Sequence, residues 1–172
     1  MKKALLLIGI LGLAATLAGP SMAAKGMWGP GYFDPDAPVG VRFWAADKVA
    51  LDINIGFMQE KFGNDSAMRF AVDFGVPFVL AGDKTTMFFV RPGVFFLSDP
   101  VNKDDSATTL WVRGSLGVEH FFSDRFSLEV AHGIYFENYD PGIKGSDTVS
   151  SFGTEAFGIS NIGFHYYLFP KP

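Results

Sequence analysis

The chain has 172 residues, a formal net charge of −4 and no cysteine. The negative charge disfavours nucleic acid and anionic lipid surfaces as electrostatic partners, and a chain without cysteine cannot rely on disulfides for its stability. Hydrophobic residues make up 48% of the sequence, and its 19 phenylalanines exceed what a soluble domain of this size needs for a core.

The N-terminus has the features of a secretory signal peptide. Lys2 and Lys3 give a positive start, Ala4–Ala18 is uncharged and apolar, and Ser21-Met22-Ala23 offers small residues for cleavage. We therefore expect a signal peptide over residues 1–23 and a single mature domain over residues 24–172. No other apolar run is long enough for a membrane helix, so any membrane role of the mature domain requires strands.

A pattern of Gly-Val, several mostly apolar residues, then Asp and a basic residue recurs along the chain. The full copies are Gly40–Lys48, Gly75–Lys84 and Gly117–Arg125, and Gly163–Lys171 is an incomplete fourth copy. In each full copy one strand leads into a short Asp-Lys or Asp-Arg turn and a second strand leads out. The pattern predicts a repeated β-hairpin.

Alternation of apolar and polar residues marks seven strands. They are Val39–Ala46, Val49–Phe62, Ala67–Ala81, Thr85–Leu97, Thr108–Phe122, Phe126–Tyr139 and Thr154–Phe169. Single-chain bacterial barrels have an even number of strands, so we place an eighth at Gly26–Phe33, with Asp34–Pro38 as the first loop. Pro77 and Pro92 cannot donate to a β-ladder, and we expect bulges at both.

Two kinds of connection alternate along these strands. Short turns centre on Asp47, Asp83 and Asp124, and longer polar connections are expected at Gly63–Ser66, Asp99–Ser106 and Asp140–Ser151. Short turns at one rim and longer loops at the other are typical of outer-membrane barrels. The predicted fold is all-β: a closed eight-stranded antiparallel up-and-down transmembrane β-barrel.

The polar face of the strands distinguishes a membrane barrel from a soluble lipocalin-like cup. It combines small residues with a few charges of both signs, which suits a crowded interior better than a water-facing surface. The predicted interior cluster is Arg42, Asp52, Arg69, Asp73, Arg91, Arg113, Glu119, Glu129 and His165. Alignment of the repeat brings Arg42, Glu119 and His165 to one level near the short turns. A structural role is expected for them, and a proton-linked or catalytic role is the alternative.

The opposite face is apolar and is expected to face lipid. His132 is its one awkward polar residue, and a bulge near Gly133 would turn it inward. Trp44, Phe122, Tyr166 and Tyr167 lie near the short turns and are interpreted as an interfacial aromatic girdle.

The last predicted strand, Gly163–Phe169, alternates aromatic residues and ends on Phe, although Pro170-Lys171-Pro172 follow. It resembles the C-terminal signature by which outer-membrane barrels are recognised for insertion. Together with the signal peptide and the hairpin repeat, the chain resembles the small eight-stranded outer-membrane barrel family of the OmpA transmembrane-domain and OmpX kind, without the peptidoglycan-binding domain. The resemblance implies a Gram-negative outer membrane, with membrane lipid, lipopolysaccharide and the barrel-insertion machinery as partners.

Catalytic and metal motifs are not found in the sequence. No histidine is followed two residues later by serine, as in barrel lipid A deacylases, and no spacing of histidines indicates a metal. We therefore expect no enzyme activity, no metal and no cofactor, and a structural or surface-interaction role. The alternatives are a barrel that binds or passes small apolar ligands and, less favoured, a lipid A-modifying enzyme.

Overall fold

The computed structural model describes residues 25–63, 65–154 and 161–168, and these residues form strands, turns and loops. The predicted signal peptide and Phe169 lie outside the described residues. No helix in the described part of the chain is long and apolar enough to cross a membrane. The strands are β1 (Trp28–Tyr32), β2 (Val39–Ala46), β3 (Val49–Phe62), β4 (Asp65–Gly75), β5 (Phe78–Gly82), β6 (Thr86–Pro100), β7 (Ser106–Phe121), β8 (Phe126–Asp140), β9 (Val149–Thr154) and β10 (Asn161–Tyr166).

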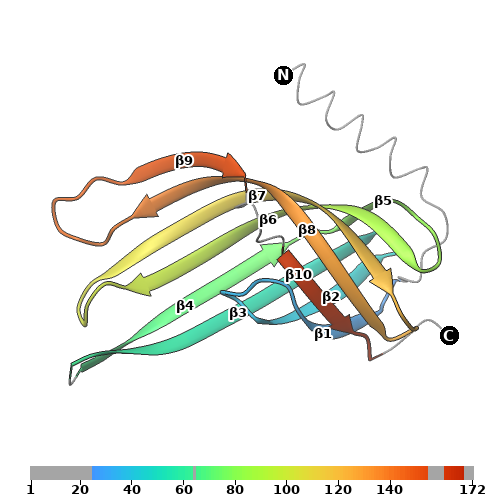
Figure 1. Cartoon of the computed structure of the whole chain (residues 1–172), viewed down its shortest axis with the longest axis horizontal. Helices are drawn as coiled ribbons and strands as arrows, with labels where there is room; N and C mark the ends of the chain where they lie inside the picture. The colour runs from blue at the N-terminus through green and yellow to red at the C-terminus, as the bar shows by residue number, and fades with distance from the viewer. Residues whose placement is uncertain (1–24, 64, 155–160, 169–172) are drawn as a thin grey trace, which may run out of the picture.

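The strands form one antiparallel sheet that closes on itself, because β10 pairs with β1 on one side and with β8 on the other (Figure 1). Two positions in the ring hold two segments each. β4 and β5 follow one another between β3 and β6, and β9 and β10 both pair with β8. The ten segments therefore make an eight-stranded barrel. This confirms the predicted closed antiparallel barrel, including its first strand.

The two ends of the barrel differ. The turns at residues 47–48, 83–85 and 122–125 lie at one end, called here the turn end, and the β3–β4, β6–β7 and β8–β9 connections lie at the other, the loop end. At the loop end the long strands project beyond β1 and β2 (Figure 1). Among the described residues β9 pairs only with β8, and β3 beyond Ile55 pairs only with β4. The ring is complete toward the turn end and has free edges toward the loop end.

Two connections illustrate how local chemistry sets the turns. In the β5–β6 turn the backbone N–H groups of Thr85 and Thr86 donate to the Asp83 carboxylate over 2.7 and 2.9 Å, and these bonds lower the pKa of Asp83. The longer polar connection predicted at Gly63–Ser66 is wrong. There β3 and β4 meet in a tight hairpin, in which Gly63 takes the left-handed φ of 66° that favours glycine.

The predicted bulges at Pro77 and Pro92 are also wrong. The β6–β7 register runs unbroken through Pro92, and the pairings before and after Pro77 keep one register. The N–H of Val76 donates to the Pro92 carbonyl over 2.9 Å, so the side of Pro92 that lacks a donor faces the break between β4 and β5. The register shifts lie instead at Ala45 and Leu80.

Side chains alternate between the two faces of the wall, and burial follows the predicted alternation. The large outward side chains are apolar. They include Val41, Phe43, Ile53, Phe57, Phe74, Phe88, Val112, Leu116, Val130, Ile162 and Phe164. Exposed charged residues of the described strands, Lys61, Asp65 and Asp140, lie at or beside strand ends at the loop end. Apart from the exposed His132, the outer wall of the described strands is therefore an apolar band.

His132 also faces outward, contrary to the prediction that a bulge would turn it inward. It is exposed, and the β7–β8 register continues without a shift through His132 and Gly133. Because no residue is inserted there, the alternation that points Val130 and Ile134 outward points His132 the same way.

The interior is layered along the barrel axis. An apolar cluster that includes Met27, Trp44, Val79, Met87, Phe121 and Tyr167 fills the turn end. A second cluster of Ala37, Ala71 and Phe95 lies toward the loop end, with Trp111 packed against it. The charged side chains lie between these two layers.

Candidate functional site: the charge network inside the barrel

Ionisable side chains from seven strands and one connection gather in the middle of the barrel. We call them the charge network: Asp34, Arg42, Asp52, Asp73, Arg91, Arg113, Glu119, Glu129 and His165. Each is at most 4% exposed. The strand members occupy inward positions of the two-residue alternation, which explains how residues far apart in the sequence meet.

Glycines on the inner wall leave room for these long side chains. A Cβ on Gly75 would overlap the guanidinium of Arg91, and a Cβ on Gly163 would overlap the side chain of Glu129. At these two positions the recurring glycine of the hairpin repeat therefore provides space for a charged neighbour on an adjacent strand.

Arg42 binds three carboxylates. Its Nε and Nη2 donate to Asp52 over 2.6 and 2.8 Å in a bidentate pair. Its Nη1 donates to Glu119 over 2.8 Å and to Glu129 over 2.6 Å. Since all four residues are at most 1% exposed, these are charge-assisted bonds in a buried interior.

Glu119 has further partners at the turn-end side of the network. Its Oε1 accepts hydrogen bonds from the Ser127 hydroxyl over 2.5 Å and the Tyr167 hydroxyl over 3.0 Å. The Nδ1 atom of His165 lies 3.8 Å from the same oxygen. That nitrogen is buried and has no hydrogen-bond partner among the described residues.

The rest of the network alternates in charge toward the loop end. Asp52 also accepts from Arg91 Nε over 2.8 Å, and Arg91 Nη2 donates to Asp73 over 2.5 Å. Arg113 joins Asp73 to Asp34, with 2.8 Å between its Nη1 and the Asp34 carboxylate. Three guanidiniums thus link carboxylates in one continuous row across the lumen.

The connection between β1 and β2 folds into the lumen, which the sequence analysis did not predict. Phe33, Asp34 and Ala37 are buried, and the guanidinium of Arg91 lies 4.0 Å from the centre of the Phe33 ring. The sequence feature that could have indicated an inward fold is a short loop with an aromatic residue and an acid next to prolines. The segment supplies Asp34 to the network and an aromatic surface for two of its arginines.

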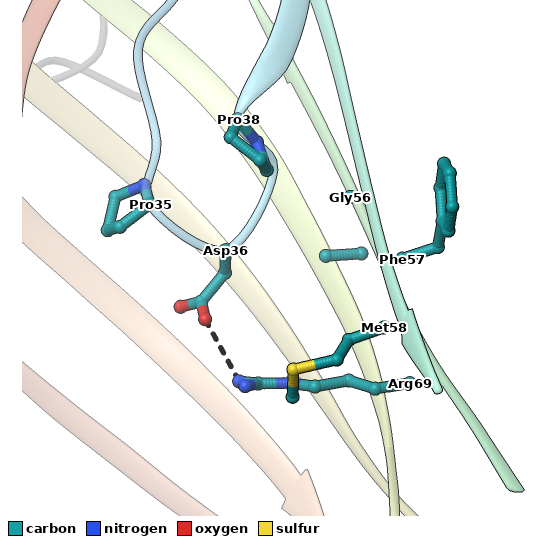
Figure 2. Close-up of a pocket in the computed structure, with 8 residues that line it drawn as sticks. Pro35, Asp36, Pro38, Gly56, Phe57, Met58 and Arg69 are labelled. Carbon is teal, nitrogen blue, oxygen red and sulfur yellow. Dashed lines mark hydrogen bonds and ion pairs between the residues drawn. The ribbon is translucent and has the colours of Figure 1, made fainter. Parts of the chain in front are cut away.

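Arg69 is the predicted cluster member that lies apart from the network. It is partly exposed, and its Nη2 donates to Asp36 over 2.9 Å. Figure 2 shows this pair beside a pocket of about 240 Å³ between the β1–β2 connection and the inner side of β3 and β4. Arg69 therefore fixes the connection from the loop-end side and takes no part in the buried row.

The predicted aromatic girdle is half wrong. Phe122 and Tyr166 are exposed on the outer wall, but Trp44 and Tyr167 are buried inside, where the indole Nε1 donates to the Tyr167 hydroxyl over 3.3 Å. Trp44 and Tyr167 each follow an inward residue by two positions, and the alternation places them on the same inner face.

Three dispersed residues bring potential metal ligands together. Glu119, Glu129 and His165 each offer one ligand atom, and these atoms lie within 4.8 Å of one another. Alignment of the hairpin repeat predicted that Glu119 and His165 share a level, but no local spacing marks the whole group, because its members come from β7, β8 and β10. The pairing of β10 with β8 brings Glu129 beside them.

The network is not balanced in charge. The described interior holds five buried carboxylates, from Asp34, Asp52, Asp73, Glu119 and Glu129, and three buried guanidiniums. If all are ionised, two negative charges are left over. In the alternating row the doubled acid position is the Glu119 and Glu129 end, beside His165.

The two hydroxyl groups beside Glu119 both donate to its carboxylate. The Ser127 hydroxyl donates to Glu119, and Ser127 is fully buried inside the barrel.

No family model, curated protein or solved structure matches the chain. The site is therefore interpreted from its own residues.

Proposed function

We propose that the protein is a structural barrel of a Gram-negative outer membrane, with a side-chain-filled interior and a surface-interaction role for its loop end. The observation that carries this proposal is the distribution of polarity across the wall. Large apolar side chains point outward along the strands, and the ionisable side chains of the middle point inward.

The extent of the outer apolar surface supports lipid as the surrounding medium. Phe57, Leu116 and Ile162 are 74%, 64% and 62% exposed, and similar residues cover neighbouring strands. Soluble monomers rarely expose contiguous apolar patches larger than a few hundred Å². In water such a surface would drive association, whereas in a bilayer it meets hydrocarbon.

The strand lengths are adequate for a membrane. β6, β7 and β8 contain 15, 16 and 15 residues. At about 3.4 Å per residue and a tilt of about 45°, such strands rise about 35 Å along the barrel axis, more than the roughly 25 Å apolar band of outer-membrane barrels.

The interior is filled by side chains, which supports a blocked lumen over a passage for apolar ligands. A row of paired arginines and carboxylates crosses the lumen, and the β1–β2 connection fills the space beside it. Eight-stranded barrels have interiors just wide enough for side chains to fill. An apolar molecule would have to pass ionised groups at every level of the row.

The described chain begins and ends at the turn end. The Lys25 N–H donates to Asp47, and the Tyr167 N–H donates to the Arg125 carbonyl. With an export signal at residues 1–23, we place the turn end in the periplasm and the β6–β7 and β8–β9 connections outside the cell. The loop end is then the surface available to partners.

Thiol labelling of intact cells tests location and orientation together, because the chain has no cysteine of its own. Asn102→Cys in the β6–β7 connection should react with a membrane-impermeant maleimide on intact cells. Lys84→Cys in the β5–β6 turn should react only after the outer membrane is permeabilised. Equal protection of both, with release of the protein by osmotic shock, would identify a soluble periplasmic cup.

Fractionation with heat-modifiability provides an independent check. The protein should remain in the detergent-extracted outer-membrane fraction and migrate differently on gels before and after boiling. Removal from membranes by salt or alkali alone would contradict the proposal.

A further inference from the structure

We infer that Glu119, Glu129 and His165 form a binding site for a single divalent transition-metal cation, for which Zn²⁺ is a suitable probe. The inference rests on three observations inside the barrel and does not depend on the medium that surrounds it.

The first observation is geometric. One ligand atom from each of the three residues lies within 4.8 Å of the others. Ligands around a tetrahedral Zn²⁺ are about 3.4 Å apart, given metal–ligand distances of about 2.0–2.2 Å. Side-chain rotations that shift the ligand atoms by about 1 Å bring the group to that geometry.

The second observation is a buried histidine nitrogen that has no hydrogen-bond partner among the described residues. The Nδ1 atom of His165 is buried, has no hydrogen-bond partner among the described residues, and lies 3.8 Å from the Glu119 carboxylate. Buried polar atoms are nearly always hydrogen-bonded or bound to an ion or water. A cation between His165 and the two glutamates gives this nitrogen a partner.

The third observation is the charge imbalance. The described interior has two more carboxylates than guanidiniums, and the surplus lies where Glu119 and Glu129 both approach Arg42. Buried charge is stable only when it is compensated. One divalent cation neutralises the two surplus charges.

The ligand types indicate the class of metal. Imidazole nitrogen suits zinc and neighbouring transition metals, whereas calcium and magnesium prefer oxygen ligands alone. The hydroxyls of Ser127 and Tyr167 donate to Glu119 and would orient it, as outer hydrogen bonds commonly do for ligating carboxylates. Arg42 remains the competing cation, which favours a site of moderate affinity.

Refolding with defined metal tests the inference without requiring an entry route into the folded barrel. The protein is unfolded in urea with chelator, refolded into detergent micelles with Zn²⁺, freed of unbound metal and analysed by atomic emission. We expect one Zn²⁺ per chain, and a higher unfolding temperature with Zn²⁺ than with the same concentration of Mg²⁺.

His165→Gln and His132→Gln form a matched pair, since His132 is exposed on the outer wall. Metal affinity should fall about tenfold or more in His165→Gln and remain unchanged in His132→Gln. Less than stoichiometric metal in the refolded wild type, or full retention in a folded His165→Gln variant, would overturn the site and leave protons as the compensating charge. If His165→Gln does not fold, a Zn²⁺-dependent rise in the wild-type unfolding temperature supports the site, and its absence rejects it.

Discussion

Asp52 joins the two halves of the charge network. It accepts a bidentate pair from Arg42 and a further bond from Arg91, while it is 1% exposed. Each of the two arginines has another acid, but only Asp52 is shared by both. Removal of Asp52 therefore affects two buried cations at once, as removal of Asp73 does for Arg91 and Arg113.

We predict that Asp52→Ala lowers the free energy of unfolding by about 3–5 kcal/mol, because it leaves two buried guanidiniums short of a partner. Urea unfolding in detergent micelles measures the loss. Asp65→Ala is the control, since Asp65 pairs with Lys103 at 3.7 Å on the surface, and its cost should stay below about 1 kcal/mol. Similar losses in both variants would contradict the role assigned to Asp52.

At this scale the sequence predicts which residues face inward but not which of them pair. The proximity of Arg42, Glu119 and His165 follows from alignment of the repeat, because equivalent positions of a hairpin repeat share a level. The bond from Arg42 to Glu129 depends instead on how the ring closes. The inward position of Trp44 follows from the sequence, since Trp44 shares the alternation of Arg42, whereas nearness to a turn does not determine which face a residue occupies.

Among the elements, β7 contrasts an inner and an outer glycine three residues apart. A Cβ on Gly117 would overlap the ring of Phe89, whereas a Cβ on Gly114 would meet nothing within 4 Å. Gly117 thus leaves room for an inward aromatic side chain, and Gly114 has no such neighbour.

We predict that Gly117→Ala destabilises the barrel by about 1–3 kcal/mol through overpacking against Phe89. Gly114→Ala should be neutral or slightly stabilising, since alanine restricts the unfolded chain more than glycine does. Urea titration of both variants in the same detergent measures the difference. Equal stability would mean that Phe89 moves aside without cost.

The residues of the β1–β2 connection were predicted from the sequence, but its position inside the barrel was not. Residues 34–38 were expected to be a loop, and they do connect β1 to β2. Their inward fold could not be predicted from periodicity, because loops have none. It depends on Arg91 and Arg113, which come from distant strands and hold Phe33 and Asp34 inside.

At the scale of the whole molecule, the barrel is characterised by its closure and by a wall that is apolar outside and polar inside. Closure was predictable from alternation, short turns and the even strand number of bacterial barrels. The unequal reach of the strands was not, because it depends on where pairing stops, as at Ile55 of β3, rather than on any one strand's composition.

We predict that Leu116→Arg destabilises the protein in lipid vesicles by about 2 kcal/mol or more, because a lipid-facing cation is costly within the apolar band. Val101→Arg in the β6–β7 connection is the control and should have little effect, since Val101 lies outside the strands. Unfolding of both variants from vesicles provides the comparison. In a soluble barrel Leu116→Arg would be tolerated and would improve solubility.

The first and last strands meet over a short length, with Gly31 opposite His165 and Tyr32 opposite Phe164. Arg42 lies on one side of this junction and Glu129 on the other, and they are joined from within. Opening the junction would separate Arg42 from Glu119 and Glu129, leaving it with Asp52 alone and leaving the two glutamates without their arginine, so a half-open barrel is disfavoured. Folding and unfolding of this barrel should therefore be cooperative. The ion pairs that hold the first and last strands together need residues from both sides of the junction.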